Sequence, residues 1–174
     1  WAYGLVDVIR GDNDQHRARM LLEVVLVVND YLVQELGYDE PLEGGLSTLA
    51  VEVATAGMGY ILDARIVNNI LSKGDKIALM SPIFTPYLEI PHLPRYNFEV
   101  INICADEMDE EGRHTWQYPE SEIDKLKDAS IKALFVVNPN NPPSVAMRPQ
   151  SVRQLKHVVE NFNPDLMIIS DDVY

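Results

Sequence analysis

The sequence lacks the features that mark several large classes of protein. Its single cysteine, Cys104, rules out a disulfide framework within the chain, so we expect a reducing, cytoplasmic location. Lys and Arg number 14 against 27 Asp and Glu, and the net charge of −13 argues against nucleic acid as a partner. Apolar runs such as residues 24–28 are too short to span a membrane, and no signal peptide is visible.

Motifs for other kinds of site are also missing. No Ser-His-Asp or Cys-His set is visible, and no glycine-rich dinucleotide fingerprint follows a predicted strand. The four histidines match no metal-ligand spacing, so we expect no metal site: His16, His92, His114 and His157.

What is present is a chain of 174 residues with 47% hydrophobic residues, enough for one domain with a core. Predicted strands are Leu49–Val53, Lys76–Met80, Phe98–Cys104, Ile131–Val137 and Leu166–Ser170. Predicted helices are Arg17–Leu36, Ala56–Leu71, Glu120–Lys127 and Gln150–Phe162. This alternation predicts an α/β fold with a mostly parallel sheet and right-handed crossovers, with ligands at the carboxyl ends of the strands.

Two irregular segments interrupt this pattern. Residues 106–118 are rich in Asp and Glu and predict a polar loop. Three prolines, Pro82, Pro86 and Pro91, disfavour regular structure after the strand at Lys76–Met80.

Polar side chains follow two of the apolar strands. The first strand runs into Asn138-Pro139-Asn140-Asn141-Pro142-Pro143-Ser144, and the second into Asp171-Asp172-Val173-Tyr174. Neighbouring strand ends would therefore carry an amide, a carboxylate and a phenol. These groups suit a flat, phosphorylated, heteroaromatic cofactor.

The two segments resemble those of the fold-type-I pyridoxal phosphate enzymes of the aspartate aminotransferase superfamily. There the first motif usually reads N-P-x-N-P-T-G and the second D-x-x-Y. Here Pro143-Ser144 replaces Thr-Gly, and together with residues 81–91 (SPIFTPYLEIP) this is similar to the bifunctional aspartate 4-decarboxylases. The resemblance covers nearly the whole chain. It implies the large domain of a pyridoxal phosphate-dependent transferase, a three-layer sandwich, present in part.

The resemblance also implies roles for the residues around the cofactor ring. Asp171, rather than Asp172, would pair with the protonated ring nitrogen. Asn141 and Tyr174 would hydrogen-bond the 3′ oxygen, and Phe84 would stack on the ring, with Tyr87 lining the same wall. Without the resemblance, plainer explanations hold: a helix cap or loop for the aspartate, a turn for the asparagine and core packing for the aromatic residue.

By the same resemblance, the cofactor phosphate would lie at the start of the helix near Ala56. Val53 and Ala54 would offer backbone amides, and Thr55 its amide and hydroxyl. Val53 and Ala54 stand where the family has glycines. A shifted register through Gly57-Met58-Gly59 is the alternative.

The family's covalently attached lysine lies beyond the second motif, and no lysine of this chain has a matching context: Lys73, Lys76, Lys125, Lys127, Lys132 and Lys156. We therefore expect a fragment that is inactive alone. Residues 1–45 would be an N-terminal helical segment, and residues 46–174 part of the large domain. The lysine-bearing part and the small domain would be absent.

The parent protein is expected to convert L-aspartate to L-alanine and CO2, with aspartate aminotransferase activity toward a 2-oxo acid, as a homodimer or higher homo-oligomer. Three alternatives stay open. One is a plain aspartate or aromatic aminotransferase. The second is a non-catalytic α/β binding module, which the substituted glycines fit. The third is a nucleotide-binding domain, which lacks its glycine fingerprint.

Overall fold

The computed structural model describes residues 22–36, 51 and 53–172, which fall in two compact units, residues 1–54 and 55–174. In the first unit, α2 (Leu22–Leu36) lies within the predicted helix Arg17–Leu36. Val51 and Val53 belong to no strand, so the strand predicted around them is wrong for these two residues. The other part of that prediction lies outside the described residues.

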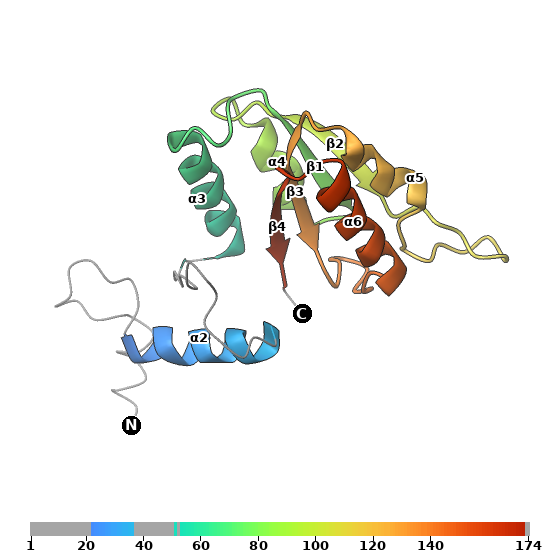
Figure 1. Ribbon diagram of the computed structural model, residues 1–174, viewed down its shortest axis with the longest axis horizontal. Helices are drawn as coiled ribbons and strands as arrows, with labels where there is room; N and C mark the ends of the chain where they lie inside the picture. The colour runs from blue at the N-terminus through green and yellow to red at the C-terminus, as the bar shows by residue number, and fades with distance from the viewer. Residues whose placement is uncertain (1–21, 37–50, 52, 173–174) are drawn as a thin grey trace. The chain divides into compact units, whose positions relative to one another are not determined.

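The second unit is a four-stranded sheet with helices between the strands (Figure 1). Its elements are α3 (Ala54–Val67), β1 (Lys76–Ser81), α4 (Thr85–Glu89), β2 (Glu99–Cys104), α5 (Glu120–Ile123), β3 (Ile131–Val137), α6 (Pro149–Asn161) and β4 (Met167–Asp171). The strand order is β2-β1-β3-β4, and every neighbouring pair is parallel. The predicted α/β fold with a parallel sheet is confirmed.

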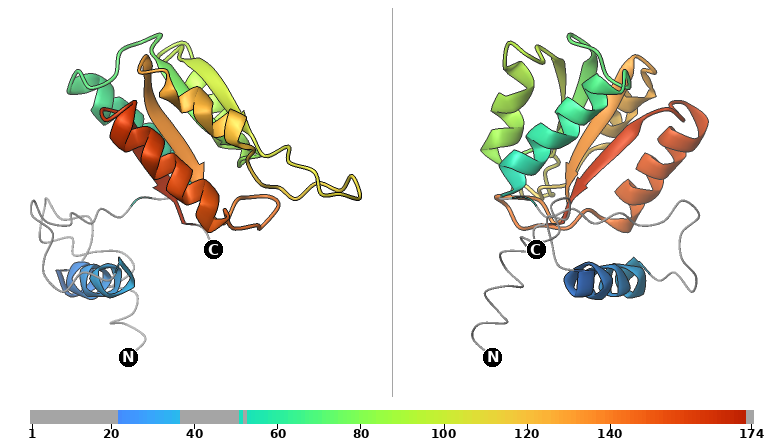
Figure 2. Two further views of the ribbon diagram at one scale, coloured as in Figure 1. Left: turned by 45° about the vertical axis from the view of Figure 1, so that its right-hand side comes forward. Right: turned by 90° about the vertical axis from the view of Figure 1, so that its left-hand side faces the viewer.

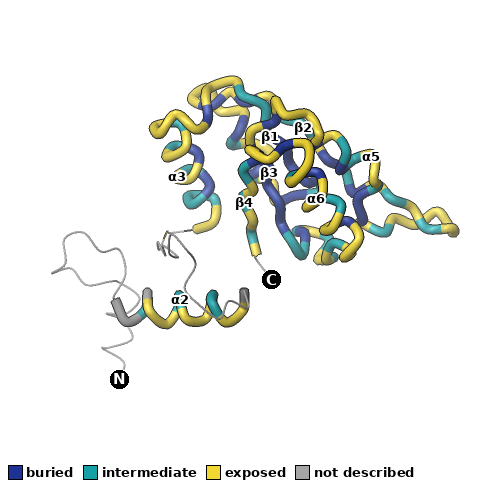
Figure 3. The backbone as a smooth tube through the Cα atoms, in the orientation of Figure 1, coloured by how far each residue is buried: buried dark blue, intermediate teal, exposed yellow. Residues whose placement is uncertain are grey.

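Side chains of β1 and β3 alternate between two apolar layers, which explains why both strands are almost continuously hydrophobic. One layer, called the α3–α4 layer here, contains Met58, Leu62, Ile77, Leu79, Tyr87, Ala133, Phe135 and Val137. The other, the α5–α6 layer, contains Ala78, Met80, Ile123, Leu134, Val136 and Val158. Figure 2 shows α3 and α4 on one side of the sheet and α6 on the other, and Figure 3 shows the buried positions concentrated along β1 and β3.

The boundaries of α3 differ from the predicted Ala56–Leu71. The helix begins at Ala54 and ends at Val67. The Asn68 side-chain amide donates to the carbonyl of Ala64 at 2.7 Å, and Asn69 has a left-handed φ of 57°. A left-handed residue after the last turn is a common helix stop, and asparagine adopts that conformation more readily than most residues.

The prediction that the prolines disfavour regular structure is wrong for residues 85–92. Pro86 lies in the first turn of α4, and Pro91 in the first turn of the 3-10 helix Ile90–His92. Proline is tolerated there because amide hydrogens of a first turn have no intrahelical partner. The predicted helix Glu120–Lys127 is divided between α5 and the 3-10 helix Asp124–Lys127.

Glu122 on α5 accepts a hydrogen bond from a backbone amide at the end of β2. Its Oε2 accepts from the Cys104 N–H at 2.7 Å and from Lys125 Nζ at 2.6 Å. Burial raises the pKa of Glu122, but the hydrogen bonds from Lys125 and Cys104 outweigh this and hold the pKa below its usual value.

We expect Glu122→Gln to destabilise the fold at neutral pH by about 1.5 to 3 kcal/mol, the range for hydrogen bonds to a charged group. Because the folded-state pKa is lowered, this stability is present above the unfolded pKa and is lost as the pH falls through the folded pKa. Urea unfolding of the full-length protein and of the variant, at neutral pH and below about pH 4, measures this difference in stability and its loss at low pH. Glu120→Gln, on the exposed side of α5, is the matched control. Equal effects of the two changes at neutral pH would contradict the expectation.

Candidate functional site

Three of the residues singled out in the sequence, Phe84, Asn141 and Asp171, lie around one edge of the sheet. The strands are parallel, so Ser81, Val137 and Asp171 end β1, β3 and β4 on the same side. Phe84 follows β1, and Asn141 lies in the loop that follows β3. Loops at the carboxyl ends of parallel strands are where α/β proteins place their ligands.

Asp171 continues a row of side chains on one face of β4. Met167 and Ile169 pack against the α3–α4 layer, and the two-residue period of a strand places Asp171 on that same face. Asp172 is exposed and accepts a hydrogen bond from Ser170 Oγ at 3.2 Å. The alternation therefore separates the two neighbouring aspartates, and only Asp171 ends the row that packs toward α4.

Tyr87 of α4 fixes one oxygen of this carboxylate. Its hydroxyl donates to Asp171 Oδ2 at 2.6 Å, and only 6% of the tyrosine is exposed. Burial and, after it, the contact with Asp171 raise the pKa of Tyr87, so the phenol keeps its proton and donates. Asp171 Oδ1 has no hydrogen-bond partner among residues 53–172 and is left for another donor.

Phe84 stands directly before α4 and packs edge-on against Tyr87. The two ring centroids are 6.2 Å apart at an interplanar angle of 73°, and the Tyr87 amide donates to the Phe84 carbonyl at 2.9 Å. Phe84 is nevertheless 39% exposed, which is high for a phenylalanine next to a buried core. Its ring is available for stacking on a planar ligand.

In the loop after β3, the neighbouring residues Asn140 and Asn141 have different hydrogen-bonding roles. Asn140 is 2% exposed; its Oδ1 accepts from the Val145 N–H at 3.1 Å, and its carbonyl accepts from the Ser144 N–H at 2.7 Å. Asn141, half-buried, has no side-chain hydrogen bond to any described residue. Asn140 therefore builds the turn, while the Asn141 amide remains available to a ligand.

Ser144 occupies the position where the resembled motif has glycine. Its φ is 58°, in the left-handed region that glycine adopts most easily. The hydrogen bond from its amide to Asn140 closes the turn in that conformation. The Pro143-Ser144 replacement thus keeps the shape of the turn.

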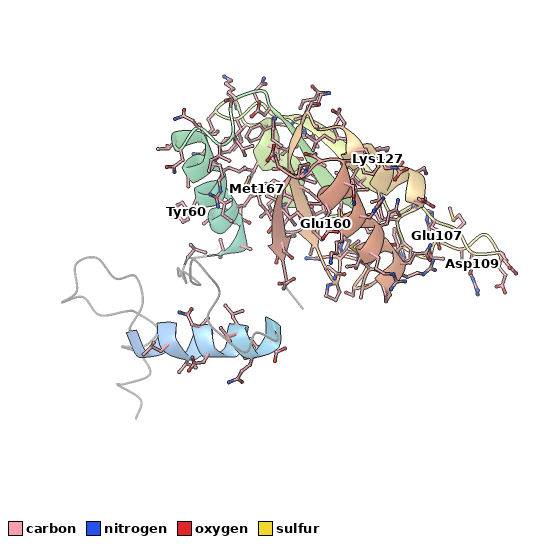
Figure 4. The ribbon with its side chains drawn as sticks, viewed as in Figure 1. Tyr60, Glu107, Asp109, Lys127, Glu160 and Met167 are labelled. Carbon is pink, nitrogen blue, oxygen red and sulfur yellow. The ribbon has the colours of Figure 1, made fainter. Side chains whose placement is uncertain are left out.

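The far end of the loop is held by the segment that follows β2. Gln117 Nε2 donates to the Ala146 carbonyl at 3.0 Å, and Gln117 Oε1 accepts from the Arg148 N–H at 2.9 Å. Arg148 also pairs with Glu107, labelled in Figure 4, at 2.5 Å. At the near end, Asn138 Oδ1 accepts from the Met147 N–H at 2.8 Å. These contacts fasten the loop at both ends.

The predicted phosphate-binding residues surround the start of α3. Val53 directly precedes the helix and is 60% exposed, and Ala54 and Thr55 are in its first turn, whose amides have no intrahelical partner. Gly59 lies deeper in the helix, where its amide is taken by the helical hydrogen-bond pattern. This favours the register built on Val53, Ala54 and Thr55 over the shifted one.

Tyr174 lies outside the described residues, so its role stays a prediction. Sequence reasoning placed Tyr87 on the wall of the site but missed its bond to Asp171, which joins residues 84 positions apart. The available signal was the period of β4, which aims Asp171 at the layer that contains Tyr87.

We expect Asn140→Ala to loosen the loop and Asn141→Ala to leave it intact. Loss of the Asn140 side-chain acceptor leaves the half-buried Val145 N–H unpaired, which costs about 1 to 2 kcal/mol locally and should raise amide exchange in residues 138–147 about tenfold. Hydrogen exchange of the cofactor-free full-length protein, read by mass spectrometry, measures this. The same loss of protection in both variants would overturn the assignment.

Comparison with known proteins gives a consistent result. The class I and II aminotransferase family matches residues 51–174. A bifunctional aspartate aminotransferase and L-aspartate beta-decarboxylase of a Pseudomonas species is 41% identical over 170 residues, which are 98% of this chain and 31% of that protein. A kynurenine–oxoglutarate transaminase of Dictyostelium discoideum is 22% identical over 62% of this chain and 26% of its own length. The chain thus spans less than a third of either relative.

Solved structures agree on the fold. An alanine aminotransferase from Pyrococcus furiosus superposes with a TM-score of 0.55 at 24% identity, over 70% of this chain and 28% of that one. A Thermus thermophilus aspartate aminotransferase mutant gives 0.50 at 21% identity, over 67% and 30%. At these identities the likeness concerns the fold alone. With the family match, it confirms the resemblance found in the sequence: the chain belongs to the aminotransferase class I and II family, whose members use pyridoxal phosphate.

Proposed function

We propose that the protein containing this chain is a pyridoxal phosphate enzyme that converts L-aspartate to L-alanine and CO2. We further propose that it transfers the amino group of aspartate to a 2-oxo acid as a second activity. The observation that carries the proposal is the Asp171 carboxylate, whose Oδ2 accepts from Tyr87 while Oδ1 has no hydrogen-bond partner among the described residues. The 41% identical Pseudomonas relative, whose name states both activities, supports the choice of reactions.

The described residues fit the cofactor ring. Oδ1 of Asp171 would accept from the protonated ring nitrogen, Phe84 would stack on the ring, and Asn141 would donate to the ring oxygen together with Tyr174. When bound, the cofactor supplies an electron sink for the substrate carbon, and a charged carboxylate at the ring nitrogen sustains it. The fit rests on three groups: the Asp171 Oδ1 and the Asn141 side-chain amide, which have no hydrogen-bond partner among the described residues, and the partly exposed ring of Phe84.

The phosphate would be held at the start of α3. Amides of Val53, Ala54 and Thr55 precede or open this helix, where free N–H groups and the helix dipole favour an anion. The Thr55 hydroxyl adds a side-chain donor. Side chains at Val53 and Ala54, in place of glycines, narrow the approach of the phosphate to the backbone.

Product analysis tests the proposed reactions. The full-length protein is incubated with pyridoxal phosphate and L-aspartate, and alanine and CO2 are measured, with and without a 2-oxo acid. Equal amounts of alanine and CO2 support decarboxylation. Oxaloacetate formed only with the 2-oxo acid, and without CO2, would instead mean a plain aspartate aminotransferase. Neither product would leave the non-catalytic module as the better account.

We expect Asp171→Asn to weaken pyridoxal phosphate binding by about 10- to 150-fold. The change removes the charge that would pair with the ring nitrogen, and hydrogen bonds to charged groups contribute about 1.5 to 3 kcal/mol. Titration of the full-length protein, followed by cofactor absorbance, measures the affinity. Asp172→Asn is the matched control, because Asp172 is exposed and bonded to Ser170. An equal effect of both changes would refute the role of Asp171.

A further inference from the structure

Two buried tyrosines of the α3–α4 layer each donate a hydrogen bond to an aspartate. Tyr87 donates to Asp171 at 2.6 Å, and Tyr96 donates to Asp63 at 2.8 Å. The two pairs share this bond but lie at opposite ends of β1, and they differ in that Arg95 donates to the Tyr96 hydroxyl and pairs with Asp63 at 3.3 Å. The Tyr96 carbonyl accepts from the Gly74 N–H, ahead of the start of the strand, whereas Tyr87 lies beyond its end.

The surroundings of Tyr87 hold its hydroxyl in one place. Its ring packs between Phe84 and Phe135, with centroids at 6.2 and 5.8 Å. The amide of Tyr87 is fixed by the Phe84 carbonyl, and only 6% of the residue is exposed. The phenol is therefore a rigid donor whose direction is set by the core.

The side chain of Asp171, in contrast, is held by few contacts with the described residues. It is the last residue of β4, and in the described sheet β4 pairs only with β3. Its side chain is half-buried, and its single hydrogen bond to a described side chain is the one from Tyr87. Without that bond, rotation about the side-chain torsions would spread Oδ1 over several positions.

We propose that Tyr87 is a positioning residue that holds the Asp171 carboxylate in the orientation needed to bind the ring nitrogen of pyridoxal phosphate. This inference rests on the proposed function. It adds that the segment after β1 contributes to binding of the cofactor ring in two ways. Phe84 would stack on the ring, and Tyr87 would orient the carboxylate of Asp171 that binds the ring nitrogen. A carboxylate fixed in advance gives up less freedom when the cofactor binds, so the tie raises affinity specifically through the ring nitrogen.

Tyr87→Phe tests the inference, because phenylalanine keeps the packed ring and removes only the donor. In the full-length protein, affinities are measured for pyridoxal phosphate and for the analogue that has carbon in place of the ring nitrogen. We expect Tyr87→Phe to lower the affinity for pyridoxal phosphate about tenfold, at the lower end of the range for charged hydrogen bonds. The affinity for the carbon analogue should stay unchanged, because that analogue has no nitrogen for Asp171 to bind.

Tyr96→Phe is the control, since it removes a tyrosine–aspartate bond from the same core layer, together with the contact of Arg95 with the Tyr96 hydroxyl. It should lower thermal stability at least as much as Tyr87→Phe but leave both affinities unchanged. A second test uses the double variant: in an Asp171→Asn background, Tyr87→Phe should have little further effect on binding, as expected for two residues that act as a unit.

The outcomes separate the two proposals. Equal losses of affinity for both ligands in Tyr87→Phe would mean that the tyrosine only packs, and no loss would mean that Asp171 needs no support; either result overturns the inference. If Asp171→Asn weakens binding while Tyr87→Phe does not, the proposed function stands and only the inference fails. If the unaltered protein binds neither ligand, the proposed function fails and takes the inference with it.

Discussion

Parallel pairing of strands that are buried on both faces is the constraint on which the rest of the structure depends. Because β1 and β3 have an apolar layer on each side, helices must cross over both faces, and every strand must run in the same direction. The carboxyl ends then meet at one edge. Phe84 and Asp171, 87 positions apart in the sequence, are joined there through a single residue, Tyr87. The site follows from the sheet rather than from any local motif.

Where local chemistry and tertiary packing agree, the sequence predicts the fold closely. The bounds Ile131–Val137 of β3 were predicted to the residue, because an apolar run ends there at polar Ser130 and Asn138. The strand predicted at Leu49–Val53 is wrong for its two described residues, Val51 and Val53, because a high valine content alone supplies no partner strand. The prediction for Pro86 is also wrong, because it took proline as a sign of irregular structure. Proline breaks a helix interior but is compatible with its first turn, and the sequence alone did not show which of these applied.

The same distinction holds for the site. The positions of Phe84, Asn141 and Asp171 were predictable because each follows or ends a strand that the apolar pattern marks clearly. The choice between Asp171 and Asp172 came from resemblance, although the period of β4 supplies a physical reason for it. The bond between Tyr87 and Asp171 was predictable only in part: the period of β4 directs Asp171 toward the α3–α4 layer, but which residue of that layer it contacts depends on how α4 packs. No spacing in the sequence encodes a contact across two layers.

The loop after β3 shows what the Pro143-Ser144 replacement does and does not explain. Ser144 adopts the left-handed conformation and donates to Asn140, so the turn closes and the Asn141 amide is presented with serine as it would be with glycine. Loss of CO2 and transfer of an amino group differ in how the carboxylate on the substrate side chain is held and desolvated. Neither Pro143 nor Ser144 carries a charge that would hold it. The replacement therefore does not by itself account for a choice between the two reactions, which would depend on groups that contact the substrate carboxylate.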